Sequence, residues 1–340
     1  MQAAWYEKNG AAQDVLRFGD KPAPNAGPGE VRIRVVCSGV NPSDVKSRAG
    51  SRPVRDDYVI PHSDGAGIID QVGPGVSAHR VGDRVWVWNA QYNRPHGTAA
   101  QYLALPANQA VPLASNVSFE AGACLGIPAL TAYRAVELAE LEPGGTVLVI
   151  GGTSAVGYYA AQMARLRGAR VIATVGGEDK AAFLHGTGFT DTVLYKQELV
   201  AERVLALTEG EGVNAIIDMD FSSTAALVDA GVLTSHGKYV CFGSNTRGAV
   251  PVNYAAWLPR SLSLHFFLVY LLTAAQRQRA VDGLQALIRS GTLQHHIGPT
   301  FALTDIVRAH QAVEAGAFGN VILNCQDQGS VGSTAPAPCP

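Results

Sequence analysis

Charged residues are scarce in this chain of 340 residues: Asp, Glu, Lys and Arg make up 16% of it, against about 25% in a typical soluble domain. Their signs balance, with 26 Lys and Arg against 28 Asp and Glu and a formal net charge of −2. Without an excess of positive charge, the chain lacks the electrostatic basis for binding nucleic acid or an anionic membrane surface. Because 47% of its residues are apolar, we expect a compact fold with a large core.

The sequence also lacks targeting, membrane and disulfide signals. It begins MQAAWYEKNG, without the basic and then apolar stretch of a signal peptide, which predicts a cytoplasmic protein. Its most apolar run, residues 266–275, is much shorter than the roughly 20 residues that span a bilayer. The five cysteines are widely spaced and include no CxxC pair, which argues against a disulfide framework and a four-thiolate zinc lobe.

Two kinds of periodicity divide the chain. Short runs rich in Val, Ile, Trp and Tyr predict a barrel-like β module at residues 31–37, 66–72, 84–88 and 98–105. Helical spacing then extends from residue 119 to about residue 138. From residue 146 to 269, about six apolar strands alternate with helices, which predicts a parallel sheet covered on both faces. Two helices and a strand at 320–324 follow, and residues 326–340 predict a disordered tail.

The strongest local signal is the glycine-rich turn GGTSAVG at residues 151–157, between the apolar strand TVLVI and a predicted helix. Glycines permit a sharp turn and close backbone approach to a pyrophosphate, which the helix N-terminus binds through its free N–H groups. The turn lacks the middle glycine of GxGxxG, since Ser154 and Ala155 occupy the centre. It predicts dinucleotide contacts from Gly151, Thr153, Ser154, Ala155, Val156 and Gly157. A tight strand-to-helix turn without a ligand is the alternative.

The end of the next strand bears on which dinucleotide would bind. NAD sites usually carry Asp or Glu about 20 residues after the first glycine, where the carboxylate accepts from the ribose 2′-hydroxyl. Here Gly176 follows the strand, and Lys180 could neutralise a 2′-phosphate. Gly176 and Lys180 therefore favour NADPH. Glu178 and Asp179 would oppose a phosphate if they faced it, and Lys180 could instead be a solvated lysine at a helix start.

Five motifs together resemble one protein family. GVNPSD at 39–44, PHSDGAG at 61–67, VGDRV at 81–85, GIPALTAYR at 126–134 and the glycine-rich turn occur in the order seen in the zinc-free quinone oxidoreductase and zeta-crystallin branch of the medium-chain dehydrogenase/reductase superfamily. The resemblance covers roughly residues 1–325. It implies an α/β protein with a GroES-like, partly open β-barrel catalytic domain at 1–121 and 297–325, and a Rossmann doubly wound parallel-sheet domain at 122–296.

The resemblance also implies a function. Members of this branch bind NADPH between the domains and reduce quinones or activated enones, so we expect an NADPH-dependent reductase of such small molecules. Because zeta-crystallin shows that the scaffold can serve as a structural protein, a non-catalytic NADPH-binding protein is the alternative.

Homodimers that pair through the last Rossmann strand are common in the superfamily. Residues 262–269 are apolar and lack the Pro or Lys that would blunt an exposed edge, so we expect a homodimer.

Zinc ligands are missing where zinc-dependent relatives carry them. The corresponding positions resemble Asn41 or Pro42, Ser63 and Ile127, none of which is a good zinc ligand. His62 and Cys124 lie nearby but out of step with the motif. We therefore expect catalysis without metal, in which the protein orients a bound nicotinamide, excludes water and stabilises an oxyanion.

The remaining site predictions come from the resemblance. Asn41 and Lys46 lie in the loop that resembles the family's active-site loop, and the Lys46 ammonium suits a developing oxyanion or the cofactor, unless it is a surface lysine. Several members have tyrosines where this chain has Lys46 and Arg52. The implied cofactor contacts are Thr131 at the nicotinamide, Tyr195 at the adenosine ribose-phosphate, Ser222 at the adenine edge, Cys241, Phe242, Gly243 and Ser244 at a strand end, and Phe266, Phe267 and Leu268 at the carboxamide, although the phenylalanines could be core residues.

Overall fold

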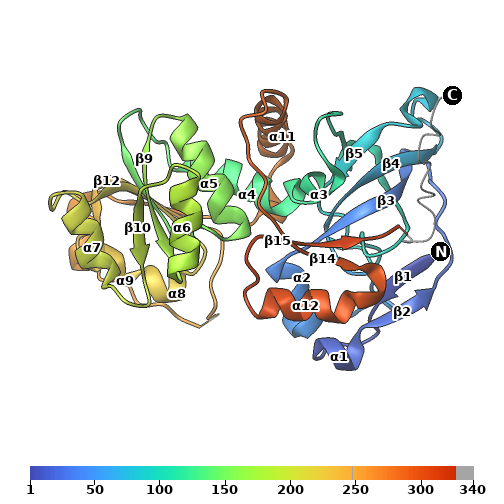
Figure 1. Ribbon diagram of the computed structural model, residues 1–340, viewed down its shortest axis with the longest axis horizontal. Helices are drawn as coiled ribbons and strands as arrows, with labels where there is room; N and C mark the ends of the chain where they lie inside the picture. Colours follow the sequence, from blue (N-terminus) through green and yellow to red (C-terminus); the bar gives the residue numbers. More distant parts are fainter. Residues whose placement is uncertain (247, 327–340) are drawn as a thin grey trace, which may run out of the picture.

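The computed structural model describes residues 1–246 and 248–326, which form two lobes, each built on its own β-sheet (Figure 1). The sheet of the first lobe has the strand order β14-β15-β3-β4-β5-β7, and β6 also pairs with β3. These strands are β3 (Glu30–Val40), β4 (Asp64–Val72), β5 (Arg84–Val87), β6 (Tyr102–Pro106), β7 (Ala110–Pro112), β14 (Ile297–Ala302) and β15 (Asn320–Asn324). The C-terminal strands therefore complete the sheet that the N-terminal residues begin, as a GroES-like domain requires.

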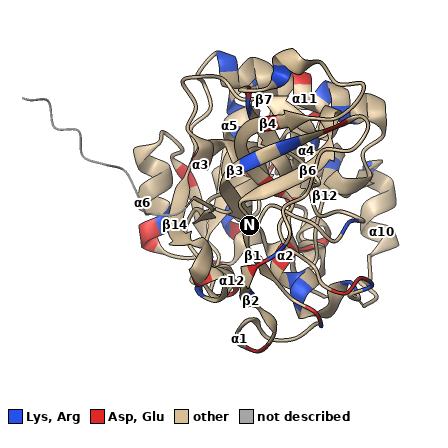
Figure 2. Ribbon diagram, turned by 90° about the vertical axis from the view of Figure 1, so that its right-hand side faces the viewer, with Lys and Arg blue, Asp and Glu red and all other residues tan. Residues whose placement is uncertain are grey.

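Smaller elements surround this sheet. A separate two-stranded sheet pairs β1 (Gln2–Trp5) with β2 (Arg17–Asp20), and the helices are α1 (Ala12–Val15), α2 (Pro42–Lys46) and α12 (Ile306–Glu314). Residues along β3 alternate between buried and partly exposed at its start and are buried throughout at its end, where β15 and β4 cover it on both edges. Lys and Arg are interspersed with Asp and Glu over the face of this lobe in Figure 2, as the balanced composition predicts.

The second lobe is a six-stranded parallel sheet in the order β10-β9-β8-β11-β12-β13. Its strands are β8 (Thr146–Val149), β9 (Arg170–Val175), β10 (Asp191–Leu194), β11 (Val213–Asp218), β12 (Leu233–Cys241) and β13 (Ser263–Phe266), and its helices are α5 (Ala155–Leu166), α6 (Glu178–Gly186), α7 (Val200–Leu207), α8 (Phe221–Thr224), α9 (Ala226–Asp229) and α10 (Tyr254–Trp257). Helices cover both faces, which explains why β8 and β9 are nearly continuous apolar runs. The expected Rossmann order is confirmed.

The segment between the lobes differs from the prediction. The helical spacing from residue 119 to 138 predicted one continuous helix, and this prediction is wrong. The structure has three helical segments there: α3 (Phe119–Gly122), a π-helical turn η4 (Leu125–Ala129) and α4 (Leu130–Leu138). Pro128 cannot donate a helical hydrogen bond, and Gly126 lies against the Asp64 carboxyl, where a Cβ would collide. The lobes share one core here, because Trp86 of β5 and Val149 of β8 belong to the same buried cluster. The helix α11 (Ala274–Arg289) also lies between the lobes (Figure 1).

The expected tail at 326–340 lies outside the described residues, apart from Gln326. In the part of the chain that the structure describes, no helix is both long and apolar enough to cross a bilayer.

A chain of buried hydrogen bonds fixes the start of β4. The Thr98 hydroxyl donates to the Asp64 carbonyl (2.5 Å), so its oxygen accepts from the Ser38 hydroxyl (2.7 Å). Ser38 has no second proton, so the contact with His62 Nδ1 (2.9 Å) requires that His62 donate from Nδ1. A neutral His62 then accepts at Nε2 from His310 Nε2–H, 3.0 Å away. Because burial lowers the pKa of both imidazoles, both are neutral at pH 7, and this hydrogen-bond chain gives each a defined tautomer.

Acid should weaken this arrangement. Burial, with a smaller effect from Arg48, lowers the pKa of His310 to about 3, and burial lowers the pKa of His62 as well. In the unfolded chain histidine titrates near 6.5, so the unfolded state binds more protons between these values. The free energy of unfolding therefore decreases as pH falls below 6.5, with His310 alone accounting for about 2 kcal/mol at pH 5. Urea denaturation at pH 7 and pH 5 measures this decrease in the free energy of unfolding. The His310→Gln variant retains a donor for His62, and its decrease should be smaller than that of the parent protein by about 2 kcal/mol.

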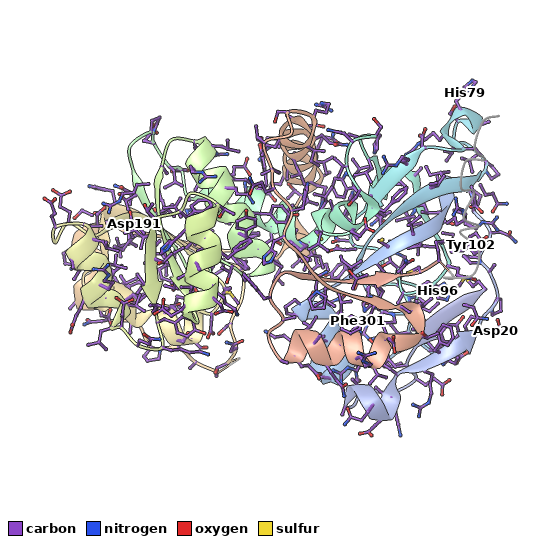
Figure 3. The ribbon with its side chains drawn as sticks, viewed as in Figure 1. Asp20, His79, His96, Tyr102, Asp191 and Phe301 are labelled. Carbon is purple, nitrogen blue, oxygen red and sulfur yellow. The ribbon has the colours of Figure 1, made fainter. Side chains whose placement is uncertain are left out.

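A surface histidine provides the control. His79 is exposed at the edge of the first lobe (Figure 3), so His79→Gln should leave the pH dependence of unfolding as it is in the parent protein. An equal response of the parent and the His310→Gln variant would contradict the assignment of this pH dependence to the buried pair.

Candidate functional site

A cleft of about 710 Å³ lies between the two lobes. In the second lobe it is bounded by the glycine-rich turn after β8 and by the C-terminal ends of β9 and β11. In the first lobe it is bounded by Val40, Pro42 and Val321. Open parallel sheets bind their ligands at the C-terminal ends of their strands, so this cleft is the candidate cofactor site.

The glycine-rich turn is held tightly against β9. Gly151 has a left-handed φ of 70°, and its N–H donates to Thr174 Oγ1 (2.8 Å), while Gly152 N–H donates to the Thr174 carbonyl (2.9 Å). A Cβ on Gly152 would lie 2.6 Å from the Cβ of Ala173. A residue with a side chain would be strained at Gly151 and would collide with β9 at Gly152. The two glycines therefore permit the tight turn that places the N-terminus of α5 at the cleft.

The same turn leaves donors free for an anion. Ser154 caps α5 by accepting from Gly157 N–H (3.0 Å), and the N–H groups of Ala155 and Val156 belong to the first helical turn, which has no intrahelical acceptors for them. Of the predicted contacts, Gly151, Thr153, Ser154 and Ala155 line the cleft, whereas Val156 and Gly157 are not among its lining residues. The geometry fits the pyrophosphate of a dinucleotide.

The end of β9 presents a cation and a hydroxyl to the cleft. Gly176, Lys180 and Tyr195 all line it, and the Tyr195 hydroxyl lies 3.2 Å from the position of a Cβ on Gly176. The Lys180 ammonium points across toward the first lobe, 5.8 Å from the centre of the Phe318 ring. Glu178 and Asp179 are exposed and are not among the lining residues. A phosphate beside Gly176 would therefore meet Lys180 and Tyr195 without facing these two acids.

One acid at the cleft was not predicted. Asp220 follows β11, and its carboxylate accepts from the Ser222 hydroxyl (2.6 Å), the Ser223 hydroxyl (2.7 Å) and both the N–H and Nδ2 of Asn245 (2.8 Å each). Although burial alone would raise the pKa of Asp220, these hydrogen bonds lower it. Asp220 thus joins two loops at the rim of the cleft. Ser222, a predicted cofactor contact, takes part in this network and does not line the cleft, whereas Ser223 does.

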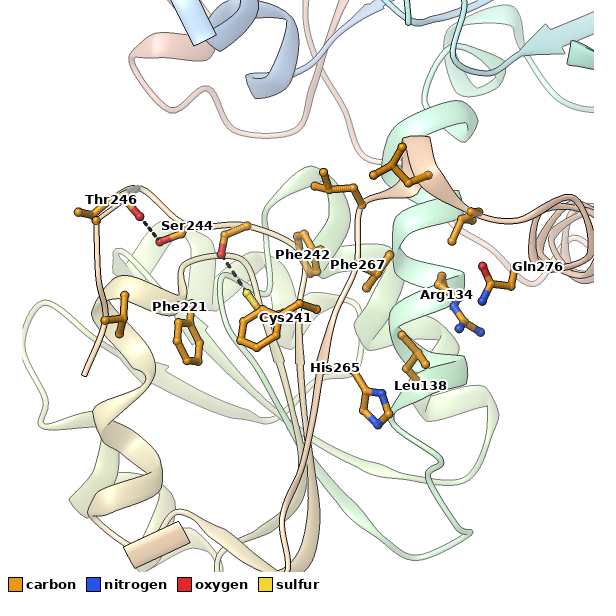
Figure 4. Close-up of a pocket in the computed structure, with 17 residues that line it drawn as sticks. Arg134, Leu138, Phe221, Cys241, Phe242, Ser244, Thr246, His265, Phe267 and Gln276 are labelled. Atoms are coloured by element: carbon orange, nitrogen blue, oxygen red, sulfur yellow. Dashed lines mark hydrogen bonds between the residues drawn. The ribbon is translucent and has the colours of Figure 1, made fainter. Parts of the chain in front are cut away.

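A second group of predicted contacts lies in a different cavity, of about 680 Å³ (Figure 4). Its lining includes Cys241, Phe242, Gly243, Ser244, Phe266, Phe267 and Leu268. The Cys241 thiol donates to the Gly243 carbonyl (3.0 Å), and the Ser244 hydroxyl donates to the Thr246 carbonyl (2.8 Å). These residues are not among those that line the cleft beside the glycine-rich turn, and their contact with a nicotinamide stays a prediction.

The predicted catalytic loop meets a buried acid, Asp64. Its Oδ2 accepts from Asn41 Nδ2 (2.8 Å) and from Ile127 N–H (2.9 Å). Asn41 N–H in turn donates to Asp44 Oδ2 (2.8 Å). Burial, and then the nearby Asp44, raise the pKa of Asp64 well above its usual range. The structure thus brings Asn41 into the interior between the lobes, whereas Lys46 ends α2 on the surface.

The positions expected to replace zinc ligands converge around Asp64. Asn41 and Ile127 share its Oδ2, and Ser63 precedes it in the chain. His62 is engaged with His310, and the Cys124 thiol donates to the Glu120 carbonyl (3.2 Å). Within residues 1–246 and 248–326, no group of three or more His, Cys, Asp or Glu side chains is placed to hold a metal ion. Independence from metal stays a prediction for solution measurements.

Comparisons with known proteins agree with this architecture. Residues 27–115 match the family described as alcohol dehydrogenase GroES-like domain, and residues 155–285 match the family described as zinc-binding dehydrogenase. The quinone oxidoreductase of Rattus norvegicus is 31% identical over 307 residues, which is 89% of this chain and 90% of that protein. The quinone oxidoreductase of Pseudomonas aeruginosa is also 31% identical over 307 residues, 89% of this chain and 93% of its own length.

Solved structures show the same fold. The crystal structure of Escherichia coli quinone oxidoreductase complexed with NADPH aligns with a TM-score of 0.84 and 26% identity over 95% of this chain and 100% of that one. A mycobacterial structure complexed with NADPH aligns with a TM-score of 0.84 and 30% identity, again over 95% of this chain and 100% of the other. The shared sequence, the two domain types and the Rossmann strand order place this chain in the quinone oxidoreductase branch of the medium-chain dehydrogenase/reductase superfamily.

Proposed function

We propose that this protein is an NADPH-dependent, metal-independent reductase of quinones or α,β-unsaturated carbonyls. The observation that carries the cofactor assignment is the cleft in which the glycine-rich turn, Gly176, Lys180 and Tyr195 lie together. The relatives named quinone oxidoreductase support the same activity. Two solved structures with this fold, one of them a quinone oxidoreductase, are described as complexed with NADPH. NADPH would bind with its pyrophosphate at α5 and its 2′-phosphate between Lys180 and Tyr195.

The chemistry assigned to the chain is positioning. A bound nicotinamide supplies a hydride, so the protein's tasks are to hold the acceptor against it, exclude water and stabilise the oxygen that becomes negative. Asn41 is buried between the lobes with its amide oriented by Asp64. This fixed polar group suits an enzyme better than a passive cofactor carrier.

The activity is tested by following NADPH absorbance with 1,4-benzoquinone, 9,10-phenanthrenequinone and a 2-enal as acceptors. Consumption of NADPH that depends on acceptor supports the reductase. NADPH binding without turnover of any of these acceptors would favour the non-catalytic alternative.

The Lys180 ammonium should select NADPH over NADH. We expect Lys180→Ala to weaken NADPH binding about tenfold, roughly 1.4 kcal/mol, and to leave NADH binding nearly unchanged, because only NADPH carries the 2′-phosphate. Dissociation constants from cofactor fluorescence measure both. Lys8→Ala, which removes an exposed lysine of the first lobe, is the control and should change neither constant, while equal losses for both cofactors in Lys180→Ala would show that Lys180 does not contact the phosphate.

Activity should survive removal of metal ions. Asn41, Ser63 and Ile127 stand where zinc-dependent relatives carry ligands, and an amide, a hydroxyl and an alkyl side chain bind zinc poorly. We expect full turnover after dialysis against EDTA and no stoichiometric metal by elemental analysis. A stoichiometric zinc ion whose removal abolishes turnover would overturn this part of the proposal.

We further propose that the protein is a homodimer paired through β13. This strand is the last in its sheet, and apolar side chains at its end and just after it are solvent-exposed, with Phe266 60% and Leu271 63% accessible. Unpaired, flat and apolar strand edges favour association with a second copy. Light scattering at micromolar concentration should give a dimer mass for the parent protein and a monomer mass for Leu271→Glu; a monomeric parent protein would contradict the proposal.

A further inference from the structure

Several buried polar atoms between the lobes have no hydrogen-bond partner. Among the described residues these include Ser63 Oγ, Asp64 Oδ1, Asn89 Oδ1, Thr131 Oγ1 and Arg277 Nη1. In folded proteins nearly all buried polar atoms are paired, and an unpaired one calls for an explanation such as a bound water or ligand. These atoms therefore call for hydrogen-bond partners that the described part of the chain does not supply.

Hydrogen bonds connect the segments of both lobes that carry these unpaired atoms. Ser63 and Asp64 stand at the start of β4, and Thr131 lies one helical turn after Ile127, whose N–H donates to Asp64 Oδ2 (2.9 Å). Asn89 follows β5, and its Nδ2 donates to the Tyr270 carbonyl (3.3 Å). The unpaired atoms thus come from a β-strand start, a strand end and the first turn of α4.

Arg277 reaches the same region from the first turn of α11. Its guanidinium lies 4.4 Å above the Trp88 ring, and its Nη2 donates to the Val269 carbonyl. Burial lowers the pKa of Arg277 to about 10, and the charge of Asp64 opposes that shift, so the two side chains are electrostatic neighbours. The Arg277 side chain is therefore anchored on one nitrogen while the other, Nη1, remains free.

Among the five residues named above, Arg277 is the one that carries a positive charge. Only 6% of its surface is exposed, and among the described residues no carboxylate lies within ion-pair distance of it. Leaving a charged donor buried without an acceptor is costly. An oxygen that carries partial or full negative charge would relieve this cost.

We propose that Arg277 Nη1 binds the carbonyl oxygen of the acceptor between the lobes and stabilises the negative charge that reduction places on it. This inference rests on the proposed reductase function. In the proposed reaction, the hydride would leave a C–H bond of the bound nicotinamide and form a new C–H bond at a quinone or enone carbon. The displaced π electrons would move to the carbonyl oxygen, which becomes an oxyanion. Arg277 holds that oxyanion, and a proton from water then completes the reduced product. The preorganised donor strengthens its interaction as the charge develops, which is the condition for catalysis.

This assignment differs from the one favoured by the sequence. Lys46, the predicted oxyanion donor, is exposed at the end of α2, where water screens its charge. Arg277 is buried, and a donor in a water-poor site contributes more to transition-state stabilisation than the same donor in solvent. Arg277 should therefore matter more for turnover than Lys46.

Steady-state kinetics with 9,10-phenanthrenequinone test the proposal. We expect Arg277→Gln to lower kcat about 100-fold and to change the dissociation constant of NADPH less than about twofold, because the residue does not line the cofactor cleft. Lys46→Ala should lower kcat only about tenfold. Arg279→Gln is the matched control: it lies on the same helix, is largely exposed and pairs with Glu137, and its removal should leave kcat unchanged.

Binding supplies a second readout without turnover. Trp88 lies under the Arg277 guanidinium, so titration of the NADP⁺-loaded protein with the same quinone should quench tryptophan fluorescence. Trp88→Phe should remove most of that signal. Arg277→Gln should weaken the quinone affinity about tenfold, whereas Arg279→Gln should not.

The outcomes separate this inference from the proposed function. If the parent protein turns over and Arg277→Gln keeps its kcat and quinone affinity while losing only thermal stability, the arginine packs against Trp88 with water on Nη1, and the inference is wrong. If the parent protein reduces no acceptor, the proposed function fails independently. Should Arg277→Gln not fold, Arg277→Lys decides: it keeps the charge but not the two-nitrogen geometry, so a tenfold or greater loss of kcat with NADPH affinity retained supports the inference, and full kcat overturns it.

Discussion

The carboxylate of Asp64 is the interaction on which the junction between the lobes depends. It is completely buried at the start of β4, and one of its oxygens accepts both Asn41 Nδ2 and Ile127 N–H. A buried carboxylate is tolerated only when donors compensate for lost hydration, and each donor would itself cost about 1–3 kcal/mol if left unpaired. The loop at Asn41, the strand β4 and the π-helical turn therefore have one mutually consistent arrangement.

The buried hydrogen-bond chain behind β4 supports that arrangement. His62 has a left-handed φ of 77°, an unfavourable conformation for a residue with a Cβ, and its ring is held at both nitrogens by Ser38 and His310. These bonds compensate for the backbone strain and set the direction in which the strand begins. Because the shared core from Trp86 to Val149 surrounds this region with apolar side chains, the polar contacts operate with little competition from water.

The cleft at the glycine-rich turn and the region around Asp64 are built in different ways. The cleft relies on backbone: glycines at 151 and 152 allow close packing on β9, and the Asp220 carboxylate joins the loops at the rim. The region around Asp64 relies on side chains from both lobes, several of them with unused hydrogen-bonding capacity. On our proposal, the region built from backbone binds the dinucleotide and the region built from side chains binds the acceptor.

Features set by neighbouring residues were readable from the sequence. The apolar run of β8, the glycine-rich turn and the missing acid at Gly176 are local patterns, and local patterns fix strand type, turn geometry and the charge at a strand end. They were sufficient for the parallel sheet and, among the residues that line the cleft, for the glycine-rich turn, Gly176 and Lys180. The tertiary structure alone decided the rest: the break at Gly126, the Asp220 network and the burial of Arg277 depend on contacts such as Asp64 with Ile127, 63 residues apart. A periodic sequence pattern cannot predict such a contact, because the contact stabilises the protein only after segments distant in sequence have packed together.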